Sequence, residues 1–75
     1  MNIEIYTNDK CGSCVKAKEY FDSNEIGYIE HNISKNSNAR KELIGMGYMS
    51  VPVIIIDGQH VLGFDLNRIK SLLDK

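Results

Sequence analysis

The sequence lacks several features that would place it in a specialised class. Its 75 residues include no tryptophan, one proline and two cysteines, and nine basic side chains nearly balance ten acidic ones. The formal net charge is −1 and the lysines are scattered, which argues against nucleic-acid or membrane-surface partners. The longest apolar run, Val51 to Ile56, is too short to span a bilayer, and no basic-then-apolar leader opens the chain. We therefore expect a cytoplasmic protein.

The remaining composition is that of an ordinary globular protein. Hydrophobic residues make up 43% of the chain and charged residues 25%, which is typical of a folded domain rather than a disordered tail. A chain of this length buries about 60–65% of its unfolded surface and builds a single core. Residues 1–75 are therefore expected to form one domain. We also expect the protein to be a monomer.

The two cysteines lie close together, in the stretch Lys10-Cys11-Gly12-Ser13-Cys14. An extended stretch precedes them and a helical stretch follows, so their side chains would stand one helical turn apart and could share a disulfide. A disulfide across so short a loop removes little entropy from the unfolded chain and is a poor structural link. The spacing therefore indicates a redox-active pair.

Hydrophobic periodicity predicts seven elements in the order βαβαββα. The predicted strands cover Asn2–Tyr6, Tyr28–Ile33, Val51–Ile56 and about His60–Leu62. The predicted helices run from Gly12 or Ser13 to about Asn24, over Ala39, Leu43 and Met46, and from an N-cap at Asp65 over Leu66, Ile69 and Leu73.

The third predicted strand, Val51–Ile56, should lie centrally in a sheet. It is apolar without alternation, which is typical of a strand buried on both faces, and Pro52 fits only at its start. Asp57-Gly58 then predicts a hairpin that adds an antiparallel edge strand, whereas the opening strand–helix–strand makes the first two strands parallel. The expected fold is α/β, with a four-stranded mixed sheet flanked by three helices.

The sequence resembles the glutaredoxins over essentially its whole length. The resemblance is carried by the element order together with Cys11-Gly12-Ser13-Cys14 after the first strand, Ser50-Val51-Pro52 before the third, and Gly63-Phe64-Asp65 before the last helix. It implies a minimal thioredoxin fold, dithiol–disulfide exchange with disulfide-containing proteins, and a cis bond at Val51-Pro52 facing the cysteines.

The residues themselves predict how the pair would work. The thiolate is the attacking species, and a free thiol with a pKa of about 8.5 supplies little of it at neutral pH. Cys11 lies where a helix begins, so backbone N–H groups, the helix dipole and Lys10 should lower its pKa, while Asp9 opposes them. Cys14 lies one turn further into the predicted helix and should be shielded from solvent. We therefore expect Cys11 to attack and Cys14 to resolve the mixed disulfide.

The resemblance also implies a binding site for glutathione as co-substrate, with no bound cofactor. Val51 and Pro52 would pair with the glutathione cysteine, and Phe64 and Asp65 would meet its γ-glutamyl end. Lys10, next to Cys11, is predicted to be a further residue of this binding site.

Two reductants fit the sequence, glutathione and thioredoxin reductase. Glutathione users usually carry Lys or Arg where this chain has Asn8. The pair Gly63-Phe64 also resembles small redoxins that donate electrons to ribonucleotide reductase and are reduced by thioredoxin reductase.

Metal binding is the alternative from another class. Heavy-metal-associated domains have a Cys-x-x-Cys after their first strand, and paired thiolates suit Cu(I) or Zn. Those domains usually have Met where this chain has Asp9, and their element order is βαββαβ. Some glutaredoxins with Gly after the first cysteine bind a [2Fe–2S] cluster between two protomers with glutathione.

Overall fold

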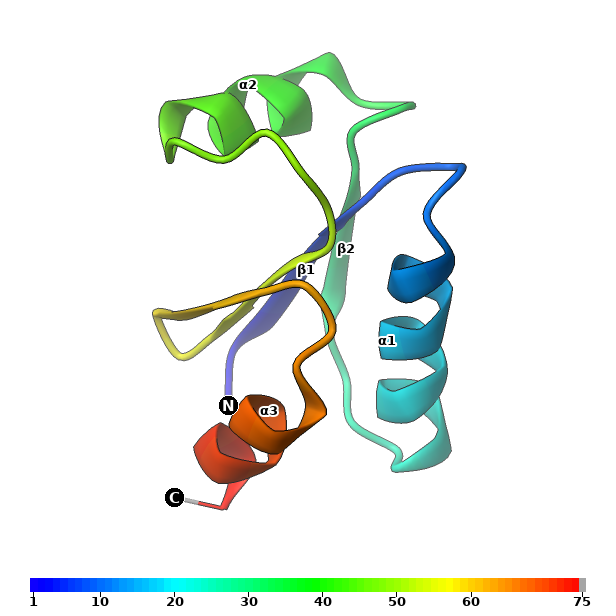
Figure 1. The fold of residues 1–75 in the computed structure, drawn as a ribbon, viewed down its shortest axis with the longest axis vertical. Helices are drawn as coiled ribbons and strands as arrows, with labels where there is room; N and C mark the ends of the chain where they lie inside the picture. Colours follow the sequence, from blue (N-terminus) through cyan, green and yellow to red (C-terminus); the bar gives the residue numbers. More distant parts are fainter. Residues whose placement is uncertain (75) are drawn as a thin grey trace.

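The computed structural model describes residues 1–74 and contains a four-stranded mixed sheet with three helices (Figure 1). The elements are β1 (Ile3–Thr7), α1 (Gly12–Ser23), β2 (Ile29–Asn32), α2 (Ser37–Gly45), β3 (Val53–Ile56), β4 (Gln59–Leu62) and α3 (Leu66–Leu73). The strand order is β2-β1-β3-β4; β1 pairs with β2 in parallel, and the pairs β1–β3 and β3–β4 are antiparallel. The predicted element order and sheet are confirmed.

The two faces of the sheet carry separate hydrophobic clusters. One cluster combines inward-facing strand residues with α1 and α3, and it consists of Ile3, Ile5, Ala17, Phe21, Ile54, Ile56, Val61, Ile69 and Leu72. The other cluster lies on the opposite face under α2 and consists of Tyr6, Ala39, Leu43 and Val53. Neighbouring residues of a strand point to opposite faces, so Ile54 joins the first cluster while Val53 joins the second. The central strand β3 is therefore covered on both faces, as its apolar sequence predicts.

Helix α1 forms because its apolar residues recur on one side. Cys14, Ala17 and Phe21 are its buried residues, at positions i, i+3 and i+7. Cys11 is the N-cap, in an extended conformation that does not continue the helix backward. The helix therefore begins at the first cysteine and buries the second.

Several element boundaries differ from the expected ones: β1 covers Ile3–Thr7 rather than Asn2–Tyr6, β2 ends at Asn32 rather than Ile33, and β4 begins at Gln59 rather than about His60. β2 begins at Ile29 rather than Tyr28, whose ring packs 5.8 Å from that of Phe21. β3 begins at Val53 because Pro52 has no N–H to donate to the sheet. In α3 Ile69 and Leu72 are buried and Leu73 is partly buried against the same cluster, so the core-facing side includes Leu72 besides the expected Ile69 and Leu73. Within residues 1–74 no helix is long and apolar enough to cross a membrane.

Candidate redox site at the start of α1

The two cysteines meet at the N-terminus of α1. Cys11 and Cys14 form a disulfide, with their Cα atoms 5.2 Å apart. The Cys11 sulfur also accepts the backbone N–H of Cys14, at an N···S distance of 3.0 Å. Cys11 is half-buried, whereas Cys14 is only 1% exposed. One sulfur is therefore reachable from solvent and the other is shielded.

The segment before β3 forms the opposite wall of the site. The Cys11 sulfur lies 3.7 Å from the carbonyl oxygen of Val51, 40 residues away in the sequence. The Val51-Pro52 peptide bond is cis, and Pro52 is buried. The fold thus brings Cys11, Cys14, Val51 and Pro52 together.

The start of α3 is attached to the same segment. The N–H of Gly63 donates to the carbonyl of Pro52 at 2.8 Å, so the turn before α3 lies beside Pro52. The ring of Phe64 packs against that of Tyr20, with centroids 6.3 Å apart, and is half-buried in the core under α1. The carboxylate of Asp65 accepts the N–H of Arg68 at 3.2 Å and caps α3, as predicted. Asp65 is exposed, and its capping role needs no ligand.

Lys10 lies on the exposed loop between β1 and α1. Its backbone N–H donates to the side-chain oxygen of Asn8 at 3.0 Å, which tightens the loop just before the first cysteine. The residue is therefore next to the reactive pair in the chain.

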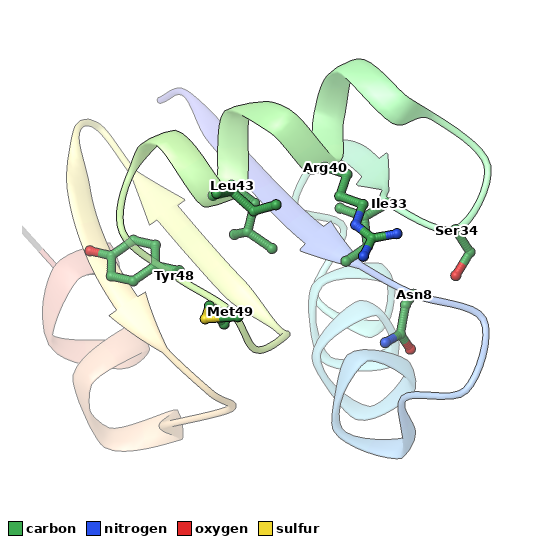
Figure 2. Close-up of a pocket in the computed structure, with 8 residues that line it drawn as sticks. Asn8, Ile33, Ser34, Arg40, Leu43, Tyr48 and Met49 are labelled. Carbon is green, nitrogen blue, oxygen red and sulfur yellow. The ribbon is translucent and has the colours of Figure 1, made fainter.

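A cavity of about 310 Å³ lies beside this loop (Figure 2). It is lined by Asn8, Ile33, Ser34, Arg40, Leu43, Ile44, Tyr48 and Met49. The Arg40 side chain reaches from α2 towards Asn8 and Ser34, while Tyr48 and Met49 lie at the opposite end. One end of the cavity is therefore polar and cationic, and the other is apolar, with Met49 94% exposed.

Sequence reasoning missed the contribution of α2 to this cavity. Arg40 follows the buried Ala39 on a short helix and has the pattern of a solvated surface residue. Only the packing of α2 over β1 brings it opposite Asn8, 32 positions earlier in the sequence. No local motif marks such a pair, whereas the Cys-x-x-Cys spacing marks its own partner.

Comparison with known proteins assigns the family. The glutaredoxin family model matches residues 3–61. The chain belongs to the glutaredoxin family. Glutaredoxin 3 of Escherichia coli is 40% identical over 65 residues, which cover 85% of this chain and 78% of that protein. An uncharacterized glutaredoxin-like 8.6 kDa protein in the rubredoxin operon of Clostridium pasteurianum is 36% identical over 74 residues, covering 97% and 99% of the two chains.

Solved structures agree with this assignment. The thioredoxin-like protein BC3987 superposes with a TM-score of 0.87 at 35% identity, over 95% of this chain and 99% of its own. NrdH-redoxin from Escherichia coli, a glutaredoxin-like protein with a thioredoxin-like activity profile, gives a TM-score of 0.85 at 26% identity, over 96% and 95% of the two chains. The minimal thioredoxin fold is confirmed. Together, the glutaredoxin family and its cysteine pair support thiol–disulfide oxidoreductase activity.

The two cysteines of one chain are too few for a structural zinc site or a [2Fe–2S] cluster. Residues 1–74 contain no group of three or more His, Cys, Asp or Glu side chains placed to hold a metal ion. Cys11 and Cys14 supply two thiolates, fewer than the four ligands of a structural zinc site or of a [2Fe–2S] cluster. The observed element order also differs from the βαββαβ order of heavy-metal-associated domains. We assign no reaction step to a metal.

A polar network connects the last residue of β1 to β2 and α1. The buried Thr7 hydroxyl donates to the carboxylate of Glu30 at 2.7 Å, and Lys18 forms an ion pair with the same oxygen at 3.0 Å. The Thr7 hydrogen bond is the main reason that the pKa of Glu30 is lowered; Lys18 acts in the same direction, and burial opposes both. The network therefore ties the strand that leads into the redox site to its two neighbours.

We expect this network to make stability depend on pH. A carboxyl whose pKa is lower in the folded state adds stability above its unfolded pKa and loses it as the pH falls through the folded value. Glu30→Gln should therefore be less stable than wild type by an amount that is full above the ordinary pKa of 4.5 and shrinks below it. Urea unfolding over a series of pH values measures this difference.

Thr7→Val provides the matched test, because it removes the hydroxyl donor and keeps a side chain of similar shape. It should reduce the same pH dependence, since the Thr7 hydrogen bond is the largest cause of the lowered pKa of Glu30. An unfolding free energy difference that stays constant across the acid range would contradict this role for Glu30.

Proposed function

We propose that this glutaredoxin-family protein reduces disulfides through Cys11 as nucleophile and Cys14 as resolving cysteine. The observation that carries the proposal is the position of Cys11. This residue is the N-cap of α1, and its sulfur accepts the Cys14 N–H at an N···S distance of 3.0 Å. In the reduced protein the Cys14 N–H and the helix dipole stabilise a thiolate at Cys11. The buried Cys14 sulfur lies close enough to Cys11 to attack it in the second step.

The proposed thiol–disulfide exchange has two steps. The Cys11 thiolate attacks one sulfur of the substrate disulfide, forms a mixed disulfide and expels the other substrate sulfur as a thiolate, which takes a proton from water. Cys14 then loses its proton and attacks the Cys11 sulfur, which releases the second substrate thiol. The substrate gains two electrons, and the protein leaves with the Cys11–Cys14 disulfide, the state seen in the structure.

We propose glutathione as the co-substrate that restores the dithiol. Asn8 lacks the cation that glutathione users usually carry there, but Arg40 lines the same cavity and supplies a guanidinium beside it. Guanidinium groups bind carboxylates with charge-assisted hydrogen bonds. A cavity of about 310 Å³ is at the lower end of the range for small-molecule sites, which suits a compact peptide. Val51, Pro52, Phe64, Asp65 and Lys10 are the proposed neighbours of the bound peptide.

A second candidate is reduction by thioredoxin reductase, with ribonucleotide reductase as the electron acceptor. The observation in its favour is the fold match to NrdH-redoxin, which covers nearly all of both chains. Under either reductant we propose that residues 1–75 act as one monomeric domain on protein disulfides in the cytoplasm.

The deciding experiment is to oxidise the protein and compare its re-reduction by glutathione with that by thioredoxin reductase. Faster recovery with glutathione supports the first proposal, and recovery only with the reductase replaces it by the second. Failure to recover with either, and failure to reduce any protein disulfide, would contradict the oxidoreductase function itself.

Arg40 gives the same experiment a residue-level prediction. Arg40→Ala should raise KM for a glutathione mixed disulfide roughly tenfold, about 1.4 kcal/mol, with kcat little changed, because the lost contact binds the substrate before and during the reaction alike. Lys41→Ala is the matched control: it removes a neighbouring exposed cation of α2 that does not line the cavity. Equal KM values for the two variants would remove Arg40 from the binding site.

A further inference from the structure

Two loops that are distant in the sequence are hydrogen-bonded to each other beside the reactive cysteine. The carboxylate of Asp9, in the loop before α1, accepts the side-chain amide of Asn32 at 2.9 Å. The Asp9 backbone N–H donates to the Ser34 hydroxyl at 3.2 Å, and the Ser34 N–H donates back to the Asn32 side-chain oxygen at 2.9 Å. The Asn32 amide group thus bonds both loops at once.

Backbone pairing between β1 and β2 continues up to this arrangement. The Ile33 N–H donates to the Thr7 carbonyl at 2.8 Å, which extends the β1–β2 ladder up to the point where the two loops begin. Asn32 is the last residue of β2 and lies opposite Thr7, the last residue of β1. Its side chain is therefore carried on the sheet, while Asp9 is carried on the loop that presents Cys11.

The direction of the Asp9 carboxylate matters for the chemistry. Asp9 lies two residues before Cys11, and the first turn of α1 contains no acidic side chain. Unpaired N–H groups at a helix N-terminus attract any nearby anion, and a carboxylate that reached them would both compete with the Cys11 thiolate and repel it. In the structure the carboxylate is bonded to Asn32 instead.

We propose that Asn32 is a positioning residue for thiol–disulfide exchange: by holding the Asp9 carboxylate at the C-terminal end of β2, it leaves the N-terminus of α1 to the Cys11 sulfur. This inference rests on the proposed nucleophilic role of Cys11. It assigns a task in the reaction to a side chain that contacts neither cysteine in the structure and that lies 21 positions after Cys11 in the sequence.

Other charged groups also surround the loop, and the variants below leave them unchanged. They are Lys10 on the loop itself, Lys35 after Ser34 and Arg40 across the cavity. A difference that depends on Asp9 can therefore be attributed to the Asp9 carboxylate.

The test is a double-mutant cycle on the reduced protein, read by the ultraviolet absorbance of the Cys11 thiolate as a function of pH. Asn32→Ala should raise the midpoint by about half a pH unit, and should slow mixed-disulfide formation at neutral pH up to about threefold, because the released carboxylate opposes the thiolate. Asp9→Asn should leave the midpoint at or below that of wild type. The double variant should match Asp9→Asn, since no charge is left to release.

Two further variants separate positioning from general damage to the fold. Asn32→Ser keeps a polar side chain for the Ser34 N–H but is too short to hold Asp9, so it should give the same rise as Asn32→Ala. Asn24→Ala removes another side-chain amide hydrogen bond, to the Tyr20 carbonyl at the far end of α1, and should leave the midpoint unchanged. Thermal unfolding of each variant confirms that the fold is retained.

The outcomes distinguish a failed positioning role for Asn32 from a failed oxidoreductase function. An unchanged midpoint in both Asn32 variants would overturn the positioning role, and so would a rise of equal size in the Asp9→Asn background. If wild-type Cys11 itself reacts with no disulfide, the proposed function fails, whatever the Asn32 variants show.

Discussion

A Cys14→Ser variant should stop at the mixed disulfide with its substrate, whereas Cys11→Ser should reduce no disulfide at all. The attacking sulfur is lost in the second case, so the rate of protein-disulfide reduction should fall roughly a thousandfold or more. In the first case attack still occurs, but no thiol is present to release the product. Mass spectrometry of the non-reduced reaction distinguishes a covalent adduct from an unreacted protein.

Serine is a suitable replacement at both positions for structural reasons. Ser is among the preferred N-cap residues, so Cys11→Ser keeps an oxygen that accepts the N–H of Cys14 and α1 still begins at the same place. At Cys14 the serine hydroxyl is nearly isosteric with the buried thiol. A loss of activity with an unchanged thermal unfolding curve therefore reports on chemistry. Full turnover by Cys11→Ser, or an adduct on Cys14 alone, would reverse the assignment of the two cysteines.

The largest stability effect should come from Ile54→Ala, in the centre of β3. Ile54 is 0% exposed and belongs to the cluster between the sheet and helices α1 and α3. Truncating a buried isoleucine to alanine removes apolar contacts and leaves a cavity, which typically costs about 2–5 kcal/mol. Small domains have about 5–15 kcal/mol of total stability, so the variant should be partly unfolded at mild urea concentrations.

Ile29→Ala provides a matched control with the same chemical change. Ile29 lies on the edge strand β2 and is 54% exposed. Surface substitutions usually alter stability by less than about 0.5 kcal/mol, so its urea midpoint should stay near that of wild type. Similar destabilisation by the two variants would mean that burial at Ile54 is not what the structure describes.

Much of this fold could be predicted because local and tertiary preferences agree. The apolar run before Asp57, the Asp57-Gly58 turn and the Asp65 cap each predict one element, and all three are in place in the structure. Asp57 has a φ of 47° and Gly58 one of 84°, the positive values that a two-residue hairpin turn requires. The boundaries were less predictable: the strand β2 begins at Ile29, one residue later than expected, and the ring of Tyr28 just before it packs against Phe21.

Some residues of the candidate site could likewise be predicted from the sequence, and others could not. The two cysteines could be found from their spacing, and the residues around Pro52 from a family resemblance. Arg40 at the cavity and Asn32 beside Asp9 could not, because each meets its partner only after β2 and α2 have packed against β1. Hydrogen bonds between residues 23 positions apart, such as that between Asn32 and Asp9, have no periodicity to reveal them.

The sheet is covered unequally, and this has a consequence for how readily its two sides open. Two helices and a large cluster lie on one face, while the nine-residue α2 and four fully buried side chains lie on the other. An element with few buried apolar contacts opens at a lower free energy than the rest of the molecule. We therefore expect α2, which carries Leu43 in the cavity wall, to open more readily than α1, which is anchored through the buried Phe21 and carries Cys14.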